Sequence, residues 1–152
     1  MECSLGAGGE LTAIVRANLV YSVSMRRVTG LGGIFFKADD PEKLYQWYEK
    51  HLGIQRKAEG VTFPWRDADN PEKEGLTAWA IFKRDSTYFD PSRAQAMINY
   101  RVDNLDAVLE ALQAEGVEID PKREDYDFGR FAWIFDPEGN KIELWEPPKD
   151  KS

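Results

Sequence analysis

The sequence predicts an α+β fold built from two βαβββ modules, and three observations lead to this prediction. The 152 residues are enough for one domain with a substantial core but few for two. Strand-like and helix-like patterns follow each other in the same order in two stretches, about residues 29–90 and 95–147. These stretches align so that Phe36-Lys-Ala-Asp-Asp-Pro41 lies over Tyr100-Arg-Val-Asp-Asn-Leu105. The halves share few identical residues, so the repeat is inferred from the pattern of residue types.

The first half opens with a strand at Gly32–Lys37, which is followed by a helix. Pro41 is suited to the first helical position, Asp40 is suited to the N-cap, and Gly53 ends the helix. Short strands are expected at about 54–58, 61–66 and 76–83. The side of the helix that we expect to be buried carries Leu44, Trp47, Tyr48 and Leu52.

The second half repeats this order. A strand at Ala96–Val102 leads into a helix capped by Asn104 and ended by Gly116, and a strand begins at 117–119. Residues 128–135 and 140–145 read as a hairpin around the turn Asp-Pro-Glu-Gly-Asn. The buried side of this second helix is expected to carry Leu105, Val108, Leu109 and Leu112.

One helix can cover only one face of each module's sheet, so the other face must curl or pair with a second sheet. Two such sheets give a cupped, barrel-like mixed sheet with the helices on the outside. Along the last strand, Ile142 and Leu144 then pack under a helix, whereas Glu143 and Trp145 face the cup.

Composition excludes several functional classes. The content of 42% apolar and 31% charged residues is that of a folded globular protein. The net charge of −7 argues against binding nucleic acid or an anionic membrane, and no apolar run is long enough to cross a bilayer. The single cysteine, Cys3, and a start without a basic signal region lead us to expect a cytoplasmic protein.

Residues 1–28 form an N-terminal extension to the domain expected at 29–150. Their apolar residues are spaced roughly as on one face of an amphipathic helix, and an extra strand or a disordered arm are the alternatives. The spacing is that of Leu11, Ile14, Val15, Leu19 and Val23.

Several aromatic side chains fall on strands that would line the cup, around one carboxylate. Such rings usually fill a core or a dimer interface, but they also form pockets for flat or apolar ligands. The candidate ligand-binding residues are Trp65, Trp79, Met97, Phe131, Trp133, Glu143 and Trp145.

Three stretches resemble the vicinal oxygen chelate superfamily, which comprises glyoxalases, bleomycin-resistance proteins and extradiol dioxygenases. They are residues 32–54, 98–119 and 129–147. The last is the most specific, because an aromatic strand, an Asp-Pro-x-Gly-Asn turn and an Ile-Glu-Leu strand follow one another. The resemblance implies the glyoxalase-like form of the two-module fold.

Many enzymes of this superfamily hold a divalent metal with His, Gln or Glu from equivalent strands of both modules. The resemblance places the last of these ligands on Glu143. The others fall on Gly32 or Gly33, on Met97, and on the strand 76–83, which has no Asp, Glu or His. The only histidine, His51, lies at the end of the first helix, where a surface or capping role is expected. We therefore expect no bound metal and no cofactor.

The resemblance and the residues together predict a metal-independent binding protein of the bleomycin-resistance type. Its ligand would be an aromatic or cationic small molecule held in an acidic cup, and the protein would be a homodimer. One alternative is a glyoxalase-like lyase, isomerase or dioxygenase with a displaced or absent metal site. The other is a dimeric interaction module that binds no ligand.

The role of Glu143 stays open at the level of sequence. It could act as a general acid or base with a raised pKa, accept a hydrogen bond from a ligand amine, remain exposed to solvent, or pair with a neighbouring cation. The candidate cations are Arg101, Arg130 and Lys37. Residues 123–130 could close over the mouth of the cup or form a solvated connection.

Overall fold

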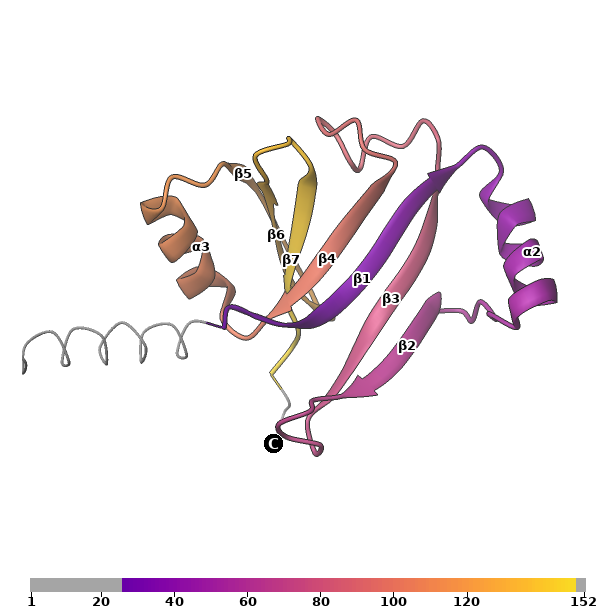
Figure 1. Cartoon of the computed structure of the whole chain (residues 1–152), viewed down its shortest axis with the longest axis horizontal. Helices are drawn as coiled ribbons and strands as arrows, with labels where there is room; N and C mark the ends of the chain where they lie inside the picture. The colour runs from indigo at the N-terminus through magenta and orange to yellow at the C-terminus, as the bar shows by residue number, and fades with distance from the viewer. Residues whose placement is uncertain (1–25, 150–152) are drawn as a thin grey trace, which may run out of the picture.

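The computed structural model describes residues 26–149, which form seven strands and two helices (Figure 1). The first half of the chain contributes β1 (Val28–Ala38), α2 (Pro41–Leu52), β2 (Val61–Arg66) and β3 (Glu74–Lys83). The second half contributes β4 (Ala96–Val102), α3 (Leu105–Ala114), β5 (Ile119–Tyr126), β6 (Gly129–Phe135) and β7 (Lys141–Glu146).

All strands belong to one mixed sheet with the order β2-β3-β1-β4-β7-β6-β5. The first strand of each half, β1 and β4, lie side by side and antiparallel, and each pairs in parallel with the last strand of its own half. The halves therefore meet at the centre of the sheet. This arrangement confirms the predicted α+β class and its two-module plan.

The strand expected at 54–58 is absent, so the first half is βαββ while the second is βαβββ. Residues 55–59 are exposed, and the only pairing there is an isolated bridge between Lys57 and Gly60. Gly60 has a φ of 101°, which turns the chain back on itself before β2. Residues 1–25 of the predicted N-terminal extension lie outside the described part of the chain.

Both helices cover the same face of the sheet, which we call the helix face. Across β1 and β4, Ile34 pairs with Ile98 and Phe36 with Ala96, so the even-numbered residues of β4 share this face with those of β1 that follow its bulge at residues 31–33. Helix α3 begins as predicted, because the Asn104 side chain accepts a hydrogen bond from the Ala107 amide at 3.0 Å. The core beneath α3 contains Val102, Leu105, Val108, Leu109, Ala132 and Leu144, with Leu112 and Ile142 packed against it.

Helix α2 has the predicted caps, since Asp40 accepts from the Lys43 amide and Gly53 is left-handed with a φ of 67°. Its predicted buried side is wrong in part. No residue of α2 is buried, and Trp47 and Leu52 are exposed. Tyr45 and Tyr48 contact the sheet, since both rings pack edge to face against Trp79 of β3, and Leu44 is partly buried.

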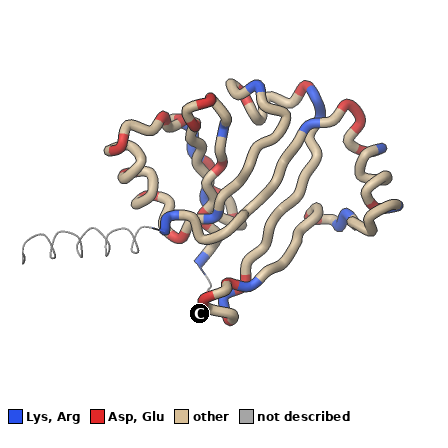
Figure 2. The backbone as a smooth tube through the Cα atoms, in the orientation of Figure 1, with Lys and Arg blue, Asp and Glu red and all other residues tan. Residues whose placement is uncertain are grey.

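The opposite face of the sheet, which we call the cup face, carries the odd-numbered residues of β4, β6 and β7. Figure 2 shows that most of β1, β3 and β4 is free of charged residues, whereas β5, the loops and the helices carry many. The loop between β3 and β4 folds over one end of this face, where Phe89 packs on Met97 and Trp133. Among residues 26–149, neither helix is long and apolar enough to cross a membrane.

Candidate functional site

A cavity of about 710 Å³ lies on the cup face and is mainly apolar. Its size is in the range of drug-sized ligand sites. The walls come from β1, β3, β4, β5, β6, β7 and three connecting segments, so both halves of the chain contribute. The lining residues are Gly32, Phe35, Glu59, Leu76, Ala78, Tyr88, Asn99, Glu124, Tyr126, Phe128, Phe131, Glu143 and Trp145.

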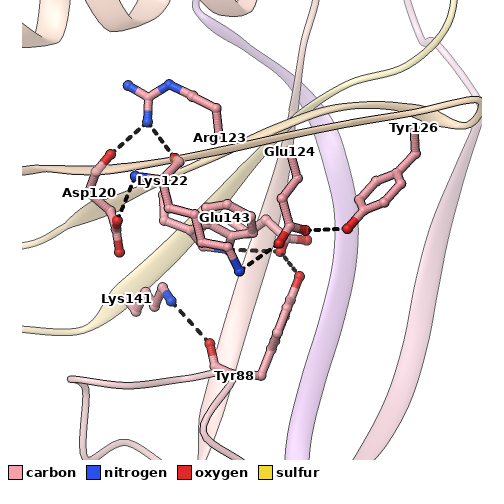
Figure 3. A network of polar contacts seen from close by, with 9 residues as sticks. Tyr88, Asp120, Lys122, Arg123, Glu124, Tyr126, Lys141 and Glu143 are labelled. Carbon is pink, nitrogen blue, oxygen red and sulfur yellow. Dashed lines mark hydrogen bonds and ion pairs between the residues drawn. The ribbon is translucent and has the colours of Figure 1, made fainter.

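Glu143 forms the polar floor of this cavity. It lies at the middle of β7, opposite Asn99 of β4 and Trp133 of β6, and only 2% of it is exposed. Oε1 accepts a hydrogen bond from Asn99 Nδ2 at 2.6 Å. Oε2 accepts from Trp133 Nε1 at 2.9 Å. It also accepts from the Tyr88 hydroxyl (Figure 3). Three donors from three separate segments therefore fix the carboxyl group.

Burial raises the pKa of the Glu143 carboxyl above its ordinary value, although the three hydrogen bonds oppose this effect. The nearby Glu124 acts in the same direction as burial. The pKa of the Tyr88 hydroxyl is raised too, first by burial and then by the Glu143 charge, so this group stays a hydrogen-bond donor. None of the three cations suggested by the sequence bonds Glu143: Arg130 pairs with Asp106, and Arg101 donates to the Glu74 carbonyl. Lys37 lies over the Phe89 ring.

Asn99 presents an unpartnered oxygen beside this carboxyl. The residue is 2% exposed, its amide nitrogen is bonded to Glu143, and its Oδ1 is buried with no hydrogen-bond partner. The glycine at position 32 makes room for it, because a Cβ there would collide with Asn99 Oδ1 and come within 3.1 Å of Trp145 Cε3. A buried acceptor without a partner costs about 1–3 kcal/mol of folding free energy.

Four rings form a continuous aromatic wall on one side of the cavity. Tyr126 and Phe128 stack at 4.9 Å between centroids, and Phe131 stacks on Trp145 at 6.4 Å. Phe128 also meets Phe131 edge to face at 5.7 Å. Tyr126 and Phe128 are 51% and 60% exposed, so they stand at the mouth and offer apolar surface to an entering molecule.

Every charged residue in this lining is acidic among the residues that the structure describes. Glu59 is exposed at the rim, Glu143 forms the floor, and Glu124 lies between them on β5. Lys122 pairs with Glu124 at 2.6 Å, and the Tyr126 hydroxyl donates to Glu124 at 2.8 Å (Figure 3). Both interactions lower the pKa of the Glu124 carboxyl. The cavity thus combines aromatic walls with three carboxyl groups, of which Glu124 is paired with Lys122.

Three of the seven predicted ligand-binding residues line the cavity, namely Phe131, Glu143 and Trp145. Two others lie directly behind it. Trp133 is 1% exposed and supports Glu143, while Met97 packs with Trp133 and Phe89. These two act as packing rather than as free surface.

The remaining two, Trp79 and Trp65, lie on the helix face, which corrects their predicted place in the cup. The Trp79 ring contacts Tyr48 edge to face at 4.8 Å under α2. Trp65 covers Gly75 and Gly30 at the β2 side of the sheet, and its Nε1 donates to Thr77 Oγ1 at 3.1 Å. The odd-numbered residues of β3 face the helices, which the sequence pattern of this strand does not reveal because apolar residues occupy both of its faces.

Sequence reasoning missed Asn99, Tyr88, Tyr126 and Phe128. Asn99 could have been predicted from the sequence, because it shares a face of the strand with the candidate residue Met97, two residues earlier. Tyr126 and Phe128 belong to residues 123–130, which are neither a lid nor a plain connection: they form the end of β5 and the turn into β6. Tyr88 lies in a loop, and its approach to Glu143 depends on tertiary structure.

The residues around Glu143 do not fit a divalent metal centre of the kind known in the superfamily. Its nearest polar neighbours are a tyrosine hydroxyl, an amide and an indole, and both carboxyl oxygens already accept hydrogen bonds. The positions of the other ligands carry Gly32, Gly33 and Met97, and within residues 26–149 no three His, Cys, Asp or Glu residues are grouped to hold a metal. His51 is exposed at the end of α2, as expected for a surface residue, and its ring lies 4.9 Å from that of Trp47 at a tilt of 38°.

Two matched sheet modules, with helices on one face of the sheet and a cavity of about 710 Å³ on the other, define the class as an α+β protein of two repeated modules. The sequence places the chain within that class: residues 30–144 match the Glyoxalase/Bleomycin resistance protein/Dioxygenase superfamily, and the chain belongs to this superfamily. Members of the superfamily typically bind small molecules. No curated protein matches the chain.

Solved structures agree with the fold. The methylmalonyl-CoA epimerase from Mycobacterium tuberculosis is 20% identical, with a TM-score of 0.53 over 83% of this chain and 93% of that one. A Streptomyces coelicolor methylmalonyl-CoA epimerase variant bound to 2-nitronate-propionyl-CoA is 14% identical, with a TM-score of 0.57 over 80% and 99%. The NAD-dependent benzaldehyde dehydrogenase from Legionella pneumophila is 12% identical, with a TM-score of 0.50 over 76% and 98%. At these identities the likeness concerns the fold alone.

Proposed function

We propose that the chain is a metal-independent binding protein for a flat aromatic cation. The observation that carries the proposal is the composition of the cavity: a wall of stacked rings faces a lining in which every charged residue described is a glutamate. Ring faces and carboxylates both attract cations, and flat rings favour flat partners.

The geometry favours binding because the site is formed before any ligand arrives. Glu143 is held by Tyr88, Asn99 and Trp133, so its carboxyl loses little freedom when a ligand binds. Phe131 and Trp145 are partly buried and stacked, so their rings are also fixed. Tyr126 and Phe128 at the mouth are exposed, so they supply the surface that a flat molecule contacts first.

The test is a titration with a panel of flat compounds that differ in charge, followed by calorimetry and by Trp fluorescence. Proflavine serves as the cation and 2-naphthalenesulfonate as an anion. We expect saturable, one-to-one binding of proflavine and none of the sulfonate. Absence of binding and of any thermal shift across the whole panel would refute the proposal.

Variants locate the binding. Glu143→Gln keeps the shape of the side chain and removes the charge, and we expect the Kd for proflavine to rise about tenfold. Phe131→Ala, which removes one ring of the wall, is expected to have a similar effect. The control is Trp47→Phe on α2, an aromatic residue that is half exposed but does not line the cavity, and it should leave the Kd unchanged.

A second candidate function, acid–base catalysis within a glyoxalase-like enzyme, is favoured by one observation. Glu143 is a buried carboxyl with a raised pKa at the floor of a cavity, as general acids and bases often are. The test is proton exchange from carbon acids such as 2-oxo acids in deuterated buffer, followed by NMR. Exchange that is lost in Glu143→Gln would favour acid–base catalysis as the function. No exchange in the wild type would favour the binding function instead.

A further inference from the structure

The orientation of the Asn99 amide follows from its neighbour. Nδ2 lies 2.6 Å from Glu143 Oε1, a distance that an N–H donor and a carboxylate oxygen require. With the amide reversed, two oxygen acceptors would face each other at this distance. The Asn99 carbonyl therefore points away from the carboxylate and has no partner of its own.

The surroundings of this oxygen belong to the cavity. Gly32, Asn99 and Trp145 all line it, and a Cβ at residue 32 would collide with Oδ1 and stand 3.1 Å from Trp145 Cε3. Buried side-chain acceptors in native proteins are nearly always satisfied. A buried acceptor without a hydrogen-bond partner at the floor of a ligand-sized cavity is therefore best explained by a donor group on the ligand.

We propose that Asn99 Oδ1 accepts a hydrogen bond from an N–H group of the bound ligand and thereby selects primary or secondary aromatic amines over fully N-alkylated cations. The proposal rests on the proposed function and specifies its ligand. Because the oxygen is covered in this conformation, a neighbouring side chain must shift when the ligand N–H reaches it. Rings and carboxylates attract any flat cation, whereas a hydrogen bond requires the N–H.

The experiment compares two flat acridine cations, proflavine with two amino groups and the ring-N-methylated form of acridine orange (acridine orange below), in which both amino groups are dimethylated and no N–H remains. Calorimetry measures both Kd values for the wild type and for Asn99→Ala. We expect wild-type protein to prefer proflavine about tenfold, and Asn99→Ala to lose this preference. A purely steric penalty of the methyl groups would persist in the variant. Comparing the ratio of the two Kd values in the wild type with the same ratio in Asn99→Ala therefore isolates the hydrogen bond.

Two further variants guard against a trivial loss of binding. Gly32→Ala should displace the Asn99 side chain and reduce the preference for proflavine without removing either donor or acceptor from the chain. Asn70→Ala makes the same substitution at an exposed loop position and should change neither Kd.

The outcomes separate the two proposals. Binding of both dyes with a ratio that Asn99→Ala does not alter would overturn the role of Asn99 and leave the binding function standing. No binding of either dye, or of any compound in the panel, would overturn both. Loss of the preference in Asn99→Ala, with acridine orange still bound, would establish the inference.

Discussion

At the scale of single residues, the site is organised by one buried carboxyl. Glu143 could be predicted as a site residue from the sequence. It lies between Ile142 and Leu144 on a strand, so its side chain points to the face opposite theirs. What the sequence could not supply is the set of three donors. Tyr88 comes from a loop and Trp133 from a neighbouring strand, and both reach Glu143 only through tertiary structure.

The raised pKa of Glu143 predicts how stability changes with pH. The folded state holds the proton more tightly than the unfolded chain, so the Glu143 contribution is fully present below its ordinary pKa of 4.5. It is lost as pH rises through the folded pKa. We therefore expect the free energy of unfolding of Glu143→Gln, relative to wild type, to increase as pH rises above 4.5. Urea unfolding of both proteins at several pH values measures this difference.

The control for this experiment is Glu115→Gln. Arg27 bonds Glu115 and lowers its pKa, so this contribution is present above the ordinary pKa and lost as pH falls. The relative stability of Glu115→Gln should therefore decrease slightly as pH rises, the effect being small because the pair is partly exposed. Equal slopes for the two variants would contradict the environment assigned to Glu143.

At the scale of elements, caps and turns were predictable because they depend on local sequence. Asp40, Asn104, Gly53 and the turn at residues 136–140 all occur where expected. The strand at 54–58 and the inward face of β3 were predicted wrongly. In β3, both faces carry apolar residues, so the period of the sequence does not indicate which face packs under a helix. Contacts with α2 determine that the odd-numbered residues do.

The N-cap of α3 gives a direct test at this scale. Removing the Asn104 side chain in Asn104→Ala frees the Ala107 amide at the start of a helix that covers the main core. We expect a loss of about 1 kcal/mol in the free energy of unfolding. Equilibrium urea denaturation provides the measurement, and Asn70→Ala, at an exposed loop position, provides the matched control. A cost no larger than that of the control would contradict this prediction. It would indicate that the hydrogen bond from the Leu105 amide to Glu146 Oε2, at 2.7 Å, is enough to stabilise the start of the helix.

At the scale of the whole molecule, the two-module plan and the position of the cavity followed from the repeat. Each half has one helix, so one face of the sheet is left for a ligand-sized cavity. Which aromatic residues line that cavity depended on the register between strands, and the register is set by bulges in β1 and by turns. The predicted homodimer, the cytoplasmic location and the role of residues 1–28 stay predictions.

The central claim is that the acidic, aromatic cavity on the cup face is the place where a flat cation binds. A crystal structure of the protein grown with proflavine tests this claim most directly. We predict planar density against the Phe131 and Trp145 rings, with an amino group directed towards Asn99 and Glu143. Density located elsewhere, for example on the exposed Trp47 of α2, with the cavity free of ligand, would contradict it.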